Sequence, residues 1–170
     1  ITTRIDNDDC FHCDMTAKIK NIYLNDKSER IVSFDWGIQY IDKTHIAARI
    51  CYPNNHFTSL IESWDTPIKT VLYCDHFFAE KYAKVQHIEC EPLWLENLHG
   101  SNVVNAVHPQ YYKIHTIWKG NLYKYGLSIY YTPIIVVLSI IAHPTQYLWP
   151  ILNHKLRLSK LKTFIKKIVK

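Results

Sequence analysis

Short apolar runs alternate with turn-forming polar residues along the first half of the chain. Residues 31–34 form an apolar run with polar flanks, as a strand in a protein core would. Three more runs predict strands at residues 44–52, 68–74 and 85–90. Residues 76–84 predict a short helix, in which Phe77, Phe78 and Tyr82 can face the sheet. Strands mixed with a helix in this order predict an α/β fold.

The second half is more apolar and ends in a basic segment. Residues 91–96 predict a loop, and a helix is expected to begin at His108-Pro109, because proline is tolerated at the first helical position. Residues 133–142 are the most apolar run and predict a buried central strand, since a membrane span needs about 20 such residues. A membrane segment over residues 127–149 remains the alternative. Residues 155–170 predict an amphipathic helix whose apolar face holds Leu161, Phe164, Ile165 and Ile168.

A length of 170 residues corresponds to one domain, and an apolar content of 48% excludes a disordered tail. We expect a polar N-terminal extension at residues 1–30 and a single domain at residues 31–170. The net charge of +5 conceals a strong asymmetry: all fifteen carboxylates lie between Asp6 and Glu96. Residues 97–170 have ten Lys and Arg and no acid, which favours contact with phosphates. A solvated basic face is the alternative.

The predicted C-terminal helix concentrates the positive charge. Its seven basic residues are candidates for nucleic-acid binding: Lys155, Arg157, Lys160, Lys162, Lys166, Lys167 and Lys170. The same helix could instead lie on an anionic membrane. Aromatic residues among basic ones could stack on bases, although a place in the core is the more common role: Trp94, Tyr111, Tyr112, Trp118, Tyr123 and Tyr125.

Two carboxylates follow predicted strands. Asp35 comes directly after the run at residues 31–34, and Glu89 ends the run at residues 85–90. Carboxylates at the ends of neighbouring strands can hold Mg²⁺, which prefers oxygen ligands. The alternative is that Asp35 caps a turn, in which Gly37 lets the backbone change direction.

Five cysteines, an odd number, fit a reducing compartment better than a disulfide framework. Cys10 and Cys13 form a Cys-x-x-Cys pair, which is half of a zinc site, and Cys74 with His76 could supply the other half. Two unpaired thiols in a loop is the alternative. The first residue is Ile1, so removal of a leader before it is left open.

Several segments together resemble a known family. An apolar run leads into Asp35-Trp36-Gly37, Ile88-Glu89 ends a later strand, and Leu138-Ser139 and Tyr147-Leu148-Trp149 precede the lysine-rich segment. In this order the chain resembles, over residues 30–170, the mitochondrial cruciform-cutting Holliday junction resolvases. That resemblance implies an RNase H-like, RuvC-type mixed sheet flanked by helices, a magnesium-dependent nuclease site at Asp35 and Glu89, and a homodimer in the mitochondrial matrix.

The sequence also departs from the family pattern. The resolvases carry two further aspartates on a helix after the basic segment, and no acid follows Glu96 here. Two-metal hydrolysis needs a cluster of carboxylates around cations roughly 4 Å apart. We therefore expect a catalytically degenerate, resolvase-like domain that binds nucleic acid, RNA rather than DNA. The resemblance implies that it serves as a structural subunit of a mitochondrial ribonucleoprotein, such as the mitochondrial ribosome, beside other proteins of that particle. An active Holliday junction endonuclease is the first alternative, and a peripheral membrane or assembly protein anchored by the C-terminal helix is the second.

Overall fold

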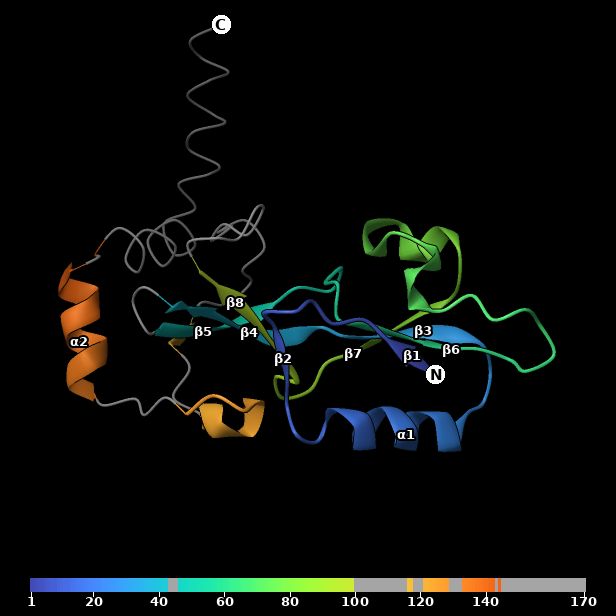
Figure 1. The fold of residues 1–170 in the computed structure, drawn as a ribbon, viewed down its shortest axis with the longest axis horizontal. Coiled ribbons are helices and arrows are strands. Elements are labelled where there is room, and N and C mark those ends of the chain that lie inside the picture. Colours follow the sequence, from blue (N-terminus) through green and yellow to red (C-terminus); the bar gives the residue numbers. More distant parts are fainter. Residues whose placement is uncertain (43–45, 100–115, 118–120, 129–132, 143, 145–170) are drawn as a thin grey trace, which may run out of the picture.

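The computed structural model describes residues 1–42, 46–99, 116–117, 121–128, 133–142 and 144. Strands of these residues form two mixed sheets, which lie side by side along the long axis of the molecule (Figure 1). The first sheet has the order β1 (Thr2–Thr3), β6 (Thr58–Ile61), β3 (Arg30–Phe34), β7 (Val85–Ile88). The second has the order β2 (Cys10–Phe11), β8 (Trp94–Leu98), β4 (Trp36–Ile41), β5 (Ile46–Cys51), β9 (Thr116–Ile117). The predicted α/β class is confirmed, and the finer RNase H-like assignment stays a prediction.

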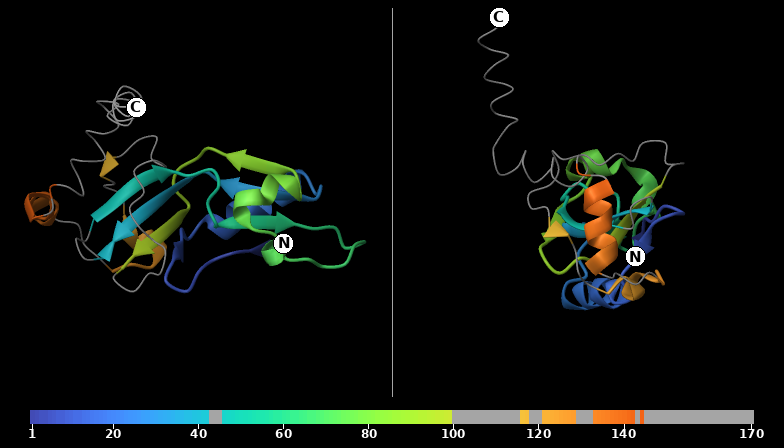
Figure 2. Two further views of the ribbon diagram at one scale, coloured as in Figure 1. Left: turned by 90° about the horizontal axis from the view of Figure 1, so that it is seen from above. Right: turned by 90° about the vertical axis from the view of Figure 1, so that its left-hand side faces the viewer.

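Both sheets are organised around one line of chain, in which β3 leads into β4 with only Asp35 between them (Figure 2). On one side, β5 pairs antiparallel with β4, and β6 pairs antiparallel with β3. On the other side, β7 runs parallel to β3, and β8 runs parallel to β4. Asp35 therefore lies where the two sheets meet.

Helices cover opposite faces of the first sheet (Figure 1). Helix α1 (Met15–Asn25) packs Met15 and Ile19 into a cluster with Val32 and Phe34 of β3. The 3₁₀ helices η2 (Val71–Tyr73) and η3 (His76–Lys81) pack on the other face, where their residues meet Ile31. Because side chains alternate along a strand, Ser33 and Asp35 belong to the face that η3 covers.

The N-terminal segment takes part in both sheets. Strand β1 pairs with β6, and β2 pairs with β8. The second sheet has its own core of Ile38, Tyr40, Ala47 and Leu95, on which the 3₁₀ helix η5 (Leu122–Tyr125) packs. Residues 1–30 thus supply β1, β2 and α1 to the fold.

The strands predicted at residues 44–52 and 85–90 are confirmed as β5 and β7. The strand predicted at residues 68–74 is wrong, because this segment contains η2 and leaves Ile68 68% exposed. Thr70 has a φ of 65°, which breaks an extended backbone. Strand β6, which the sequence analysis did not predict, takes the place beside β3 instead.

Two neighbouring predictions are also wrong in part. A short helix is confirmed at η3, but Phe77, Phe78 and Tyr82 are at least half exposed and do not face the sheet. With three residues per turn, a 3₁₀ helix turns only a narrow face inward, and Ala79 occupies it. The loop predicted at residues 91–96 is wrong, because β8 begins at Trp94.

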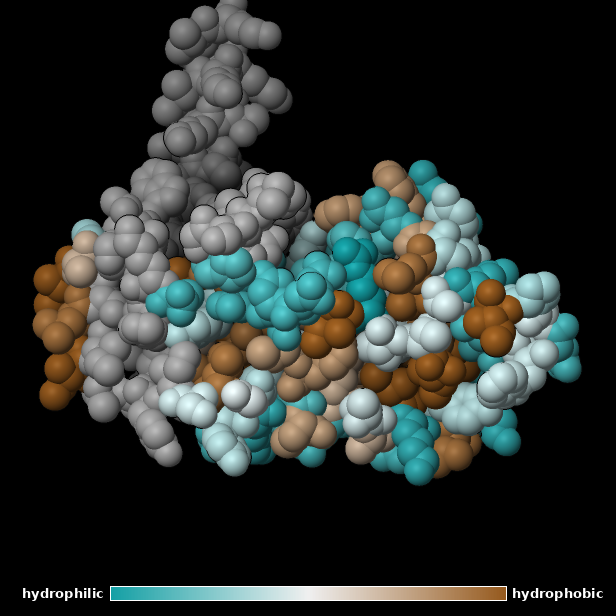
Figure 3. Space-filling view, in the orientation of Figure 1, coloured by the Kyte–Doolittle hydropathy of each residue, from teal (hydrophilic) through white to brown (hydrophobic). Residues whose placement is uncertain are grey.

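The buried strand predicted at residues 133–142 is wrong: this run is helix α2 (Pro133–Ala142). Ile134, Val137, Leu138 and Ile141 are exposed, and they form an apolar surface at the left of Figure 3. An unbroken apolar run has no alternation that would separate a strand from a helix. Within the described residues, no helix has the length and apolarity needed to cross a membrane. The predicted helices at residue 108 and at 155–170 lie outside the described residues.

Candidate functional site

Asp35 is held by backbone contacts at the junction of the two sheets. Its N–H donates to the carbonyl of Ile88 (3.1 Å), and its carbonyl accepts from the N–H of Tyr52 (2.7 Å). Asp35 is only 5% exposed. The alternative in which it caps a turn is wrong, because the chain continues straight into β4 through Gly37.

The close approach of the Trp94 ring requires a glycine at position 37, and this glycine does not serve a turn. A Cβ at Gly37 would lie 2.1–2.2 Å from three ring atoms of Trp94. The Trp94 ring is 1% exposed, and its Nε1–H donates to the carbonyl of Phe34 (2.7 Å). The Asp-x-Gly pattern therefore combines a buried carboxylate with a site where only a glycine lets the indole lie across the strand.

The two carboxylates predicted as site residues come together at neighbouring strand ends. The parallel register pairs Phe34 of β3 with Ile88 of β7, so Asp35 and Glu89 are the next residues on each strand. Their surroundings differ, because Glu89 is exposed and Asp35 is buried. Strand β3 ends directly before Asp35 as predicted, whereas β7 ends at Ile88, two residues before the end of the predicted strand.

The imidazole of His87 contacts the carboxylate of Asp35. Its Nδ1 lies 2.8 Å from Oδ1 of Asp35, and its Nε2 lies 3.7 Å from Oε1 of Glu80. A carboxylate that binds one ring nitrogen fixes the orientation of the imidazole, so the other nitrogen can exchange a proton or bind a ligand. Asp35 would have to release His87, or share it, before this oxygen could bind Mg²⁺.

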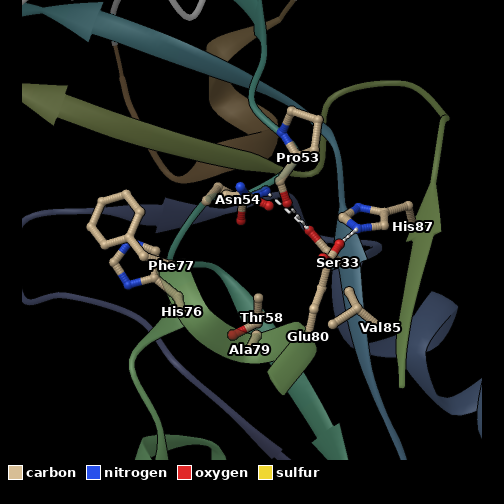
Figure 4. Close-up of a pocket in the computed structure, with 11 residues that line it drawn as sticks. Ser33, Pro53, Asn54, Thr58, His76, Phe77, Ala79, Glu80, Val85 and His87 are labelled. Carbon is tan, nitrogen blue, oxygen red and sulfur yellow. Dashed lines mark hydrogen bonds and ion pairs between the residues drawn. The ribbon is translucent and has the colours of Figure 1, made fainter. Parts of the chain in front are cut away.

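A polar cavity of about 30 Å³ opens beside these residues (Figure 4). Its lining includes Ser33 of β3, His87 of β7 and Glu80 of η3. The hydroxyl of Ser33 donates to the carbonyl of Pro53 (2.9 Å) and accepts from Nδ2 of Asn55 (3.3 Å). This volume suits one or two water molecules and excludes a nucleotide.

His76 lines the same cavity from η3. Burial, together with the nearby charges of Arg4 and His56, lowers the pKa of its imidazole to about 4. The guanidinium Nη1 of Arg4 lies 3.4 Å from Nδ1 of His76. His76 is therefore neutral at pH 7.

The two cysteines of the predicted zinc pair, Cys10 and Cys13, have different surroundings. Cys10 lies on β2, where burial and the charges of Asp9 and Asp8 raise the pKa of its thiol. Cys13 is exposed, and its sulfur lies within 4.8 Å of ligand atoms of His12 and Asp14, a group that does not include Cys10. All five cysteines belong to the described residues, and none of them forms a disulfide bond.

Only three of the residues predicted to contact nucleic acid belong to the described part of the chain. Trp94 and Tyr125 are buried and belong to the core, whereas Tyr123 is 73% exposed. The other candidates fall outside the described residues: Tyr111, Tyr112, Trp118, Lys155, Arg157, Lys160, Lys162, Lys166, Lys167 and Lys170.

Sequence reasoning missed His87 and Glu80. A signal for His87 was present, because alternation along residues 85–89 places His87 on the same face as Glu89. Glu80 reaches the site from a 3₁₀ helix, and no local pattern indicates that contact. Comparison of the chain with protein families, curated proteins and solved structures gave no match.

Proposed function

We propose that this protein binds nucleic acid through its basic C-terminal part and that Asp35 has a structural role. The observation that carries this proposal is the segregation of charge, with every carboxylate at or before Glu96 and ten Lys and Arg after it. A polyanion is attracted to a basic segment that has no acids of its own. The acid-rich part would repel the same ligand.

The surroundings of Asp35 support the structural half of the proposal. A magnesium-dependent nuclease needs several open carboxylate oxygens around its ions. Asp35 is 5% exposed and is hydrogen-bonded to His87, and Glu91 is turned toward Arg49, with 4.0 Å between the charged groups. The proposed ligand is an RNA in a ribonucleoprotein. The mitochondrial location stays a prediction from the resemblance.

Fluorescence anisotropy with labelled single-stranded RNA, duplex DNA and a four-way DNA junction tests binding. We expect replacement of four C-terminal lysines by glutamine to weaken binding about tenfold or more: Lys160, Lys162, Lys166 and Lys167. The matched control replaces four exposed lysines of the acidic part: Lys18, Lys20, Lys27 and Lys81. An equal effect of both sets, or no binding by the unaltered chain, contradicts the proposal.

One observation favours a second candidate, a magnesium-dependent junction endonuclease. The parallel register of β3 and β7 makes Asp35 and Glu89 neighbours at adjacent strand ends. Cleavage of a four-way junction in Mg²⁺ that is abolished by Asp35→Asn and kept by Glu91→Gln would establish this activity. If the unaltered chain and both variants leave the junction intact, the endonuclease candidate is contradicted and only the binding function remains.

A further inference from the structure

Three metal-ligating side chains meet away from Asp35, where the turn between β1 and β2 approaches the segment between β5 and β6. Asp6 and Asp9 come from that turn, and His56 comes from the second segment. Their ligand atoms all lie within 4.8 Å of one another. Nε2 of His56 is 3.0 Å from Oδ2 of Asp9 and 3.9 Å from Oδ2 of Asp6.

These separations match the edges of a coordination polyhedron. Zinc binds imidazole nitrogen and carboxylate oxygen at about 2.1 Å, so its ligands stand about 3 to 4 Å apart for angles between 90° and 140°. Both His56 distances fall in this range. A cation at the centre would replace the direct contact of His56 with Asp9 without moving either segment far.

The carboxylate of Asp9 is buried in the protein interior. Its side chain is 1% exposed, and Oδ1 accepts the backbone N–H of Asn97 (2.9 Å), which leaves Oδ2 facing His56. Oxygen ligands of metals are commonly oriented by such a bond to their second oxygen. A buried carboxylate is costly without a positive partner, and a divalent ion supplies one.

A second observation comes from Asn97 itself. Its side-chain oxygen Oδ1 is buried and has no hydrogen-bond partner. Buried polar atoms are nearly always satisfied, so this oxygen, on the residue whose N–H holds Asp9, is a candidate partner for a water that completes the coordination of an ion.

Neighbouring charges leave the three ligands available. Arg4 contacts Oδ1 of Asp6 (3.5 Å), and Oδ2 of Asp6 is the atom that faces His56. Asp8 is engaged by His99 (2.8 Å) and stands outside the group. The ring of His56 packs on Phe57 with 4.1 Å between centroids, which fixes the imidazole.

We propose that Asp6, Asp9 and His56 bind one divalent first-row transition ion, with Zn²⁺ as the best match. One imidazole and two carboxylates suit zinc, whereas Mg²⁺ is held by oxygen ligands and water. The ion would join the turn between β1 and β2 to the segment between β5 and β6. It would act as a structural staple for the N-terminal segment, which pairs with both sheets.

Isothermal titration calorimetry of the full chain with Zn²⁺ tests the site. Cys13→Ser is used as the background, because Cys13 with His12 and Asp14 forms a competing group. We expect one ion per chain, and we expect Asp6→Asn and His56→Gln each to weaken binding at least about tenfold. Asp6 is half exposed, so its variant is expected to fold even if a change at His56 disturbs the core.

The control is His99→Gln, which removes a histidine from the same neighbourhood but not from the ligand group. The proposal is supported if His99→Gln keeps the affinity for Zn²⁺ and if Zn²⁺ raises the melting temperature of the background chain by more than that of its Asp6→Asn form. It is overturned if no Zn²⁺ binds, if Asp6→Asn binds as tightly as the background, or if His99→Gln weakens binding as much as Asp6→Asn does.

Discussion

Replacing Gly37 by alanine is the sharpest test of the packing beside Asp35. The added Cβ would lie 2.1–2.2 Å from the Trp94 ring, where ordinary contact needs 3.4–4 Å. The ring cannot retreat easily, because it stacks on Phe57 with 4.7 Å between centroids and donates to Phe34. Overpacking costs about 1–3 kcal/mol, and loss of the indole hydrogen bond costs about 1 kcal/mol more. We expect Gly37→Ala to lower the free energy of unfolding by about 2–4 kcal/mol.

Urea denaturation followed by tryptophan fluorescence measures this loss. For a chain of this size, an m-value of about 2 kcal/mol/M turns the loss into a midpoint lower by about 1–2 M. Gly126→Ala is the control: its φ is 78°, but an added Cβ meets nothing within 4 Å, so only backbone strain of about 1–2 kcal/mol is expected. A Gly37→Ala midpoint equal to that of the unaltered chain would refute the packing argument.

Three further predictions concern Asp35 and two residues that line the cavity beside it, His76 and Asn55. The folded-state pKa of His76 is lowered to about 4, so between pH 6.5 and 4 the unfolded chain binds a proton that the folded chain does not, and the folded chain loses stability as the pH falls. His76→Gln should remove this loss, which is about 1–2 kcal/mol in the free energy of unfolding measured by urea titration. Asn55→Ala should cost about 2–4 kcal/mol by the same assay, since the buried amide donates to three oxygens; a loss below about 0.5 kcal/mol would contradict this. Asp35→Asn should leave RNA affinity within about twofold in anisotropy titrations, because we assign binding to the C-terminal charges; a tenfold change would place Asp35 in the binding site.

The elements that sequence reasoning found are those with a bounded pattern. Residues 31–34 are a short apolar run with polar flanks, residues 85–90 are a short segment that mixes apolar and polar residues, and both contribute strands to the first sheet. Residues 133–142 are apolar throughout, so periodicity could not separate a strand from a helix; a strand was predicted, and the chain forms a helix. Strand β8 was missed because Glu91 and Pro92 suggest a loop, although the strand begins two residues later.

In the candidate sites too, features that depend on neighbouring residues could be predicted from the sequence, and contacts between distant segments could not. Asp35 and Glu89 were predicted because each stands at the end of a predicted strand. The contact of His87 with Asp35 depends on the register between β3 and β7, which no local pattern gives. Asp9 and His56 are 47 residues apart and lie in segments without regular structure, so only the fold brings them together.

The salt dependence of RNA binding tests the central claim most directly. The predicted C-terminal helix carries seven positive charges and no negative one. If four of them contact phosphates, the logarithm of the association constant should fall with the logarithm of salt concentration with a slope of about −3 for single-stranded RNA. Anisotropy titrations between 50 and 300 mM KCl, about the range over which such slopes are measured, give this slope. A slope near −3 that becomes shallower when the four lysines are replaced is the predicted result. A slope near zero, or one that the lysine replacements leave unchanged, would contradict nucleic-acid binding by this segment.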